Sequence, residues 1–242
     1  MKPLLEVCVD DAEGLRQAVL GGADRIELCS SLESGGLTPS RGLMELAIRG
    51  PIPVHALIRP RVGNFRYGTE ETAVMLADIR SAREAGLAGV VIGASRTDGS
   101  LDGDLLRALL SAADGMDVTL HRAFDVAPDL AVALDHAISL GFRRILTSGG
   151  ARHAESGREM LRKLAAQGAG RVSIMPGGGI RPENAADFLS LPGIHELHAS
   201  CSAPVAVDAG LVAFGFEAPS RRQTDGDTVR RLKQVMVAAS GA

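Results

Sequence analysis

The stretch Arg25–Gly50, RIELCSSLESGGLTPSRGLMELAIRG, contains one complete strand–loop–helix unit. At its start, Ile26 and Leu28 alternate with ionisable or polar positions, which predicts a short strand. A loop with two adjacent glycines follows. The segment Thr38–Gly50 then has apolar residues at helical spacing, with a threonine able to cap the helix and Pro39 suited to its first turn. A unit of this kind is typical of folds that alternate parallel strands with helices.

The same alternation recurs along the whole chain and decides the predicted fold. We expect strands at Leu4–Val9, Arg25–Cys29, Val54–Arg59, Gly89–Gly93, Val118–Arg122, Arg144–Thr147, Val172–Pro176 and Glu196–Ser200. Helical spacing is found at Asp11–Gly22, Thr38–Gly50, Thr69–Gly86, Ala127–Gly141, Arg181–Leu191 and Asp227–Ala239. About eight β/α units in a chain of this length predict an α/β fold of the (β/α)8 TIM-barrel class. A doubly wound open sheet is the alternative, but no G-x-G-x-x-G motif follows the first strand.

We expect one domain over residues 1–242, with a barrel core at about 3–200, a less regular segment at 202–225 and a C-terminal helix at about 227–239. The chain is 45% hydrophobic and has a net charge of −3, which excludes wholesale disorder and does not indicate a nucleic-acid partner. Its apolar runs are too short to span a membrane, and its start lacks the apolar region of a signal peptide. We therefore expect a soluble, cytoplasmic protein, and self-association into a homo-oligomer is expected for a barrel of this size.

Ionisable side chains are concentrated on one face of the predicted strands. Side chains alternate in direction along a strand, so residues two apart point the same way. The pairs that share a face in this sense are Glu6 with Cys8, Glu27 with Cys29, Thr119 with His121 and His198 with Ser200, and His55 and Arg59 also share one. We expect these faces to line the barrel interior, because the opposite faces are apolar and suit contact with helices. Such an interior is either an ion-pair network or an active site, and crowding with glycine loops favours a site.

Two glycine clusters and one basic loop follow predicted strands. The clusters end the sixth and seventh strands, and they predict an anion or phosphate site that involves Arg59, Gly149, Gly177, Gly178 and Gly179. The alternative is tight turns that need positive φ. The loop at residues 59–71 interleaves arginines with Phe65 and Tyr67, which predicts either a lid over the site or a solvated surface loop.

Three cysteines, Cys8, Cys29 and Cys201, follow or end strands that are neighbours in a closed barrel. They therefore fall in one sector of the rim, together with His198. Thiolates favour copper(I) and imidazole suits copper or zinc, so a metal site is one interpretation. The other is three small packed hydrophobic residues. An odd number of cysteines argues against a disulfide framework.

Several motifs resemble those of the CutC family, in the same order and at the same spacing. They are GADRIELCSSLESGGLTPS, PVHALIRPRVGNFRY, VTLHRAFD, RILTSGG, and MPGGGIRPEN followed by ELHAS, and the resemblance covers about residues 3–200. It implies a TIM barrel and cytoplasmic copper handling. It also implies that Cys8 and Cys29, which lie inside matching motifs, are copper(I) ligands. Cys201 follows the ELHAS motif, where family members are expected to differ.

Two functional hypotheses result. The first is a copper homeostasis protein that binds copper(I) through Cys8 and Cys29, with His198 or Cys201 as a third ligand. The alternative is a TIM-barrel enzyme, of the lyase or isomerase type, that acts on a small anionic or phosphorylated metabolite. Its catalytic candidates are Glu27, Arg59, His121 and His198: Glu27 or His121 would transfer protons, and Arg59 would hold the anion together with the glycine loop. A third interpretation is a purely structural salt-bridge network inside the barrel.

Overall fold

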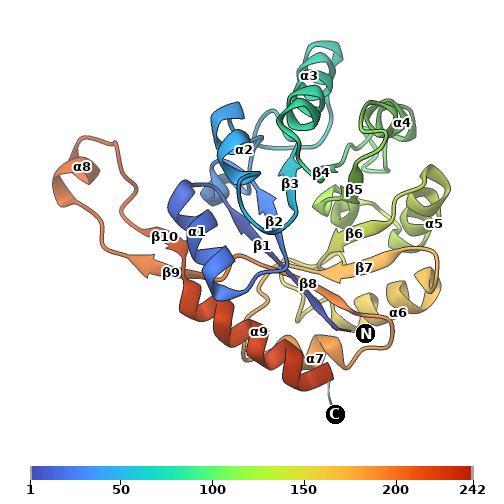
Figure 1. The fold of residues 1–242 in the computed structure, drawn as a ribbon. Coiled ribbons are helices and arrows are strands. Elements are labelled where there is room, and N and C mark those ends of the chain that lie inside the picture. The colour runs from blue at the N-terminus through green and yellow to red at the C-terminus, as the bar shows by residue number, and fades with distance from the viewer. Residues whose placement is uncertain (1, 241–242) are drawn as a thin grey trace.

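A computed structural model describes residues 2–240 and contains the predicted barrel. Its eight parallel strands follow one another in the order β7-β6-β5-β4-β3-β2-β1-β8. The two end strands, β7 and β8, lie side by side, so the sheet closes almost completely on itself (Figure 1). The strands are β1 (Leu4–Val9), β2 (Arg25–Leu28), β3 (Val54–Leu57), β4 (Gly89–Ile92), β5 (Asp117–Leu120), β6 (Arg144–Thr147), β7 (Ser173–Pro176) and β8 (Glu196–Ala199).

Helices surround the strands on the outside, as Figure 1 shows. They are α1 (Ala12–Gly21), α2 (Arg41–Ala47), α3 (Thr69–Ala85), α4 (Gly103–Ala112), α5 (Leu130–Leu140), α6 (Arg158–Gly168), α7 (Ala185–Leu189) and α9 (Gly226–Ser240), with short 3-10 turns at η1 (Leu32–Ser34) and η2 (Arg122–Val126). None of the helices in the described part of the chain combines the length and apolar character needed to cross a bilayer. The TIM-barrel prediction is therefore confirmed.

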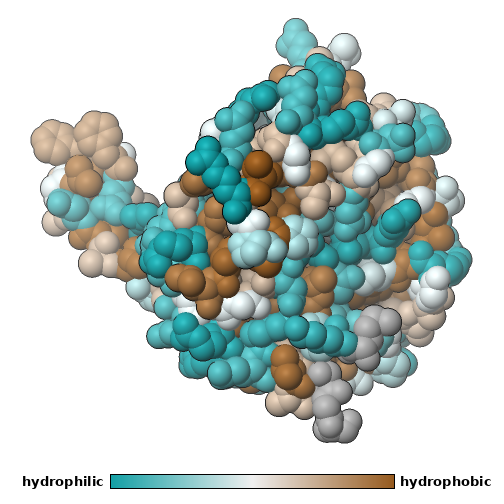
Figure 2. Space-filling model, in the orientation of Figure 1, coloured by the Kyte–Doolittle hydropathy of each residue, from teal (hydrophilic) through white to brown (hydrophobic). Residues whose placement is uncertain are grey.

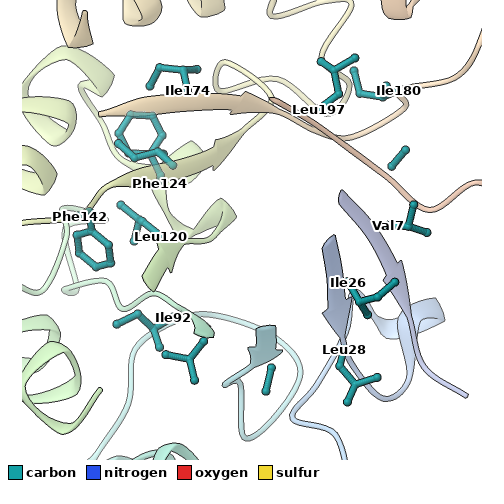
Figure 3. Close-up of a cluster of buried hydrophobic side chains, with 14 of the residues drawn as sticks. Val7, Ile26, Leu28, Ile92, Leu120, Phe124, Phe142, Ile174, Ile180 and Leu197 are labelled. Atoms are coloured by element: carbon teal, nitrogen blue, oxygen red, sulfur yellow. The ribbon is translucent and has the colours of Figure 1, made fainter. Parts of the chain in front are cut away.

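The main hydrophobic core lies between the strands and the helices. It contains the apolar face of each strand, including Val7, Ile26, Leu28 and Leu120, all of which are fully buried. Figure 3 shows these side chains projecting from their strands beside the covering elements. Burial of these residues against the helices stabilises this arrangement of the sheet. The opposite face of each strand therefore turns toward the barrel axis, as the alternation predicts.

The structure corrects the predicted start of the second helix. Ser40, rather than Thr38, caps α2, because its hydroxyl accepts a hydrogen bond from the N–H of Leu43 at 3.2 Å. Pro39 consequently lies before the cap and outside the first turn. The Thr38 hydroxyl instead accepts from the backbone N–H of Arg59 at 2.9 Å. This contact ties the loop after β2 to the end of β3, beside the predicted site.

The segment predicted to be less regular forms an arm that leaves the barrel. Strands β9 (Ser202–Val205) and β10 (Arg221–Thr224) pair in antiparallel fashion, and α8 (Ala209–Ala213) lies between them. Figure 1 shows this arm standing clear of the barrel. Near its tip the side chains of Phe214 and Phe216 are 80% and 82% exposed, and apolar surface is visible at the tip in Figure 2. The arm does not contribute to the barrel core.

Candidate metal and ligand site

Charged residues in the lower part of the barrel interior pair with one another. We call Glu6, Arg25, Asp117, Arg144 and Glu196 the lower network. Arg25 donates to Glu6 and, at 2.8 Å, to Glu196. Arg144 donates to Glu196 at 2.6 Å and to Asp117 at 3.0 Å. The chain of ion pairs crosses the barrel, so the structural interpretation of the polar interior is right for this layer.

The lower network fixes the charge states of its carboxylates. Burial acts to raise the pKa of Glu6, but Arg25 and His198 outweigh it and hold that pKa well below its usual range. Burial also acts to raise the pKa of Glu196, but Arg144 and Arg25 outweigh it and lower the pKa of this carboxyl. Both acids are therefore ionised and paired at neutral pH, which leaves neither carboxylate free for chemistry.

A cavity of about 280 Å³ lies above the lower network, at the carboxyl ends of the strands. It is lined by most of the predicted site residues, and we call it the upper cavity. Its lining includes Cys8, Glu27, Cys29, Arg59, Phe65, His121, Gly178, Gly179 and His198. A larger hollow of about 550 Å³ lies at the opposite end of the strands, near Leu4 and Val172. The predicted site residues do not line that hollow, so the upper cavity is the better candidate for function.

Three side chains of the upper cavity lie close enough together to hold one metal ion, and we call Cys8, Glu27 and His198 the metal-binding group. The Cys8 sulfur, a Glu27 carboxylate oxygen and a His198 ring nitrogen all lie within 4.8 Å of one another, and all three residues are buried. Strand register explains this, because Cys8 pairs with Glu27 on β2, and His198 pairs with Glu6 on β1. Glu27 was predicted only as a proton-transfer group. Its nearness to sulfur and imidazole depends on the register of three strands.

The other two cysteines differ in their surroundings. Cys29 is fully buried, and its sulfur lies 3.7 Å from a Glu27 carboxylate oxygen, next to the metal-binding group. Cys8, Cys29, Leu57 and Val91 form a small cluster separate from the main core. Cys201 instead packs within the main hydrophobic core. All three are free thiols.

The metal-binding group has unusual charge properties. Burial raises the pKa of Glu27 to about 7 against the attraction of His198. Burial also raises the pKa of the Cys29 thiol well above its ordinary value. At His198 burial acts to lower the pKa, but Cys8, Glu27 and Glu6 outweigh it and raise the pKa. The His198 Nδ1 donates to Glu6 at 2.8 Å, and its Nε2 faces Glu27 at 3.7 Å. A carboxylate thus orients this imidazole, as is common for metal-binding histidines.

Arg59 is buried without a carboxylate partner. Its guanidinium donates to the backbone carbonyls of Ser34 (3.2 Å), Gly36 (2.9 Å) and Gly63 (3.1 Å). No acid in the described part of the chain forms an ion pair with it, and its Nε has no hydrogen-bond partner there. The guanidinium lies 5.2 Å from the centre of the Phe65 ring. Arg59 therefore brings an uncompensated positive charge to the wall of the upper cavity.

His121 is held as a neutral imidazole with a defined tautomer. Its Nδ1 accepts a hydrogen bond from the N–H of Ala123 at 3.0 Å, so the proton lies on Nε2. Burial, with help from Arg59, lowers the pKa of His121 to about 3. The Nε2 atom is buried and has no partner among the described residues. The ring stacks at a tilt against Phe65, with 4.9 Å between centroids. In this tautomer His121 presents its Nε2–H to the upper cavity as a hydrogen-bond donor.

The first glycine cluster already holds an anion of the protein itself. The Asp125 carboxylate accepts from the N–H groups of Ser148 (3.0 Å) and Gly150 (3.1 Å), and from the Arg122 Nε at 2.7 Å. The N–H of Gly149 donates to the Thr147 hydroxyl at 2.9 Å. At this loop, the carboxylate of Asp125 takes the place of the predicted anionic ligand. Asp125 is the last residue of the VTLHRAFD motif, and the sequence does not predict this contact because it joins two separate β/α units.

The second glycine cluster leaves backbone donors free. Gly177 donates to the Thr147 carbonyl at 3.0 Å. The N–H groups of Gly178, Gly179 and Ile180 have no partner within the described residues, and all three residues line the upper cavity. Gly178 and Gly179 have φ of +91° and +87°, so the tight-turn interpretation also applies here. Successive free N–H groups of this kind suit an anion.

The loop predicted as a lid is held together by Arg61. Arg61 pairs with Glu71 at the start of α3, donates to the Asn64 carbonyl at 2.9 Å and lies over the Tyr67 ring. The Phe65 carbonyl accepts from the N–H of Ser95 at 2.9 Å. Phe65 reaches the upper cavity, whereas Arg61 serves the loop itself.

Comparison with known proteins places the chain in a family. The CutC family model matches residues 3–203. A CutC family protein of Sinorhizobium medicae is 56% identical over 95% of this chain and 94% of its own length. One from Caulobacter vibrioides is 49% identical over 91% of both chains. A solved CutC structure from Streptococcus agalactiae, assigned to copper homeostasis, is 32% identical with a TM-score of 0.78, and the match covers 82% of this chain and 98% of that one.

More distant barrels share the fold alone. A thiamine phosphate pyrophosphorylase from Pyrococcus furiosus is 14% identical with a TM-score of 0.59, over 98% of this chain and 97% of that one. The family model ends at residue 203, at the base of the arm, so the arm lies outside the matched core. The motifs that predicted the relationship, the barrel and the curated relatives agree, and this chain belongs to the CutC family.

Proposed function

We propose that this protein binds copper(I) in the upper cavity as part of cytoplasmic copper homeostasis. The observation that carries the proposal is the convergence of the Cys8 sulfur, a Glu27 oxygen and a His198 nitrogen within 4.8 Å of one another. A soft sulfur ligand beside imidazole suits copper(I) better than hard divalent cations. The assignment of the Streptococcus agalactiae relative to copper homeostasis supports it.

Each residue of the proposed copper site has its own role in binding. Cys8 would bind the ion as a thiolate and His198 as a neutral imidazole, so each would release its proton as the metal enters. Glu6 holds His198 in place through Nδ1, which leaves Nε2 for the ion. Cys29, whose sulfur lies beside Glu27, is the second sulfur available to the site. Three free thiols also fit a reducing compartment, which supports the cytoplasmic part of the proposal.

A competition titration tests this function. The reduced protein is titrated with copper(I) against a colorimetric chelator. We expect the Cys8→Ser, Cys29→Ser double variant to lose affinity by about 100-fold, since removing a group that supports a metal already costs 10–100-fold. Cys201→Ser is the matched control, because Cys201 packs in the main core, and it should bind like the parent. Equal affinity in the double variant and the parent would refute copper binding at this site.

A second function is favoured by the size of the upper cavity. The cavity extends well beyond the metal-binding group, to Arg59, His121 and the free N–H groups of residues 178–180. A single ion does not need about 280 Å³. We therefore also propose an enzyme that acts on a small anionic metabolite, with Glu27 as the proton-transfer group nearest the ligand. Thermal-shift screening of small anionic metabolites tests this, and a screen in which none stabilises the protein would count against it.

A further inference from the structure

We propose that Arg59 and His121 form an oxyanion seat that the Phe65 side chain covers. The ligand is a small organic anion whose carboxylate or phosphoryl oxygens take the place of the Phe65 ring. This inference deepens, and rests on, the second function proposed above. It assigns a binding role to two buried donor atoms, Arg59 Nε and His121 Nε2, which have no acceptor among the described residues and which the copper site does not use.

The charge of Arg59 supplies the attraction. Arg59 is 8% exposed, and it takes part in no ion pair among the described residues. Burying an ionised group without a partner is costly, and buried charges in proteins are normally paired. Three carbonyls satisfy part of its hydrogen bonding but supply no negative charge. An oxyanion in the upper cavity would provide that charge and would accept from the free Nε.

The tautomer of His121 fixes the direction of its hydrogen bond to a ligand. The Ala123 N–H occupies Nδ1, so only the Nε2–H can be given to a ligand. This donor is fixed by the backbone of η2 rather than by a second side chain. Gly93 makes room for the ring, because a Cβ at that position would lie 2.4 Å from His121 ring atoms. A neutral donor held in one orientation suits an oxygen acceptor, whether a carboxylate, a phosphoryl group or a carbonyl.

Phe65 contacts both donors and explains why they lack acceptors. Its ring centre is 5.2 Å from the Arg59 guanidinium carbon and 4.9 Å from the His121 ring centre. A buried donor without an acceptor destabilises the protein, and a ligand oxygen would relieve that cost. Because Ser95 holds the Phe65 carbonyl at 2.9 Å, rotation of the ring opens the seat while the loop backbone stays in place. The free N–H groups of residues 178–180 then contact the remainder of the ligand.

Nuclear magnetic resonance of the metal-free, reduced protein with ¹⁵N-labelled histidine tests the seat. Pyruvate serves as the carboxylate probe, and inorganic phosphate and phosphoglycolate serve as phosphoryl probes. We expect the His121 Nε2–H tautomer at neutral pH and a shift of its Nε2 resonance on addition of the probe that binds. Calorimetry should give a loss of at least about tenfold in affinity for His121→Phe, since one hydrogen bond to a charged group is worth about 1.5–3 kcal/mol. His121→Gln, which keeps a donor near the Nε2 position, should stay within about threefold of the parent.

The controls separate this inference from the function on which it rests. His136→Phe alters a histidine outside the upper cavity and should bind the probes like the parent. Unchanged affinity in His121→Phe, with no shift of the His121 resonance at saturation, would overturn the seat while the second function stands. If none of the three probes binds the parent, the seat and the second function both fall. The copper titration is independent of either result.

Discussion

The lower network and the upper cavity both contain buried arginine and glutamate side chains, but only in the lower network do these side chains form close ion pairs among the described residues. In the lower network, Arg25 and Arg144 each contact two carboxylates. In the upper cavity, Arg59 has no carboxylate partner among residues 2–240, and the shortest ion-pair contact of Glu27 within those residues is the one to His198, at 3.7 Å. Glu6 and Arg25 are buried as Glu27 and Arg59 are, so burial alone does not identify a site. Incomplete pairing does, because it leaves charge available for a ligand.

Arg25→Met should give the largest effect and tests the lower network. The variant leaves Glu6 and Glu196 buried with one partner fewer, and breaking a buried ion pair costs about 3–5 kcal/mol. The free energy of unfolding would be measured by urea denaturation followed by circular dichroism, because the chain has no tryptophan. Arg83→Met, which removes an exposed arginine on α3, is the control and should change stability far less. A loss below about 1 kcal/mol for Arg25→Met would contradict the proposed structural role of this layer.

Acid should weaken the same layer through Glu196. Its folded pKa is lowered from the ordinary 4.5, so the folded protein binds this proton less readily than the unfolded chain. The stabilisation is fully present above pH 4.5 and is lost as the pH falls below that value. Urea denaturation of the parent and of Glu196→Gln from pH 7 down to about 3 measures it. We expect the difference in the free energy of unfolding between the parent and Glu196→Gln to become smaller below pH 4.5. A constant difference across this range would show that Glu196 is not the acid-sensitive group.

Glu27→Gln should have the smallest effect on stability. The amide has the same shape, and Glu27 makes no close ion pair that the change would break. We expect a change in the free energy of unfolding of less than about 1 kcal/mol in either direction. The same variant should bind copper(I) more weakly than the parent, because it removes a carboxylate from the metal-binding group. A loss of stability as large as that of Arg25→Met would remove the distinction between the two layers.

Local patterns in the sequence predicted most of the barrel. All eight strands are present within one or two residues of the predicted ends. They could be predicted because alternation of apolar and ionisable residues, as at Ile26 and Leu28 in β2, is a local property of the chain. The helix after β2 begins later than predicted. Both Thr38 and Ser40 could cap it, and the backbone N–H of Arg59 competes for Thr38. Such a competition depends on a strand that lies far away in the sequence.

Candidate site residues were found because polar residues at strand ends meet at one rim, but their roles were less predictable. The glycines after β6 look like those after β7 in sequence, yet Asp125 binds the N–H groups of the first loop and leaves the second free. Which ring nitrogen of His121 carries the proton depends on the N–H of Ala123, which donates to Nδ1. Both outcomes depend on hydrogen bonds whose geometry the residue types do not specify.

The fold class, the inward-facing set of ionisable residues and the family follow from periodicity and from motifs of consecutive residues. Which buried charges neutralise one another, and which remain available, depends on how the barrel packs. Arg25 and Arg59 are both arginines at strand ends, but barrel closure brings Glu6 and Glu196 to the first and only backbone carbonyls to the second. The energy of a buried charge depends on its nearest partners, and strand register sets those partners.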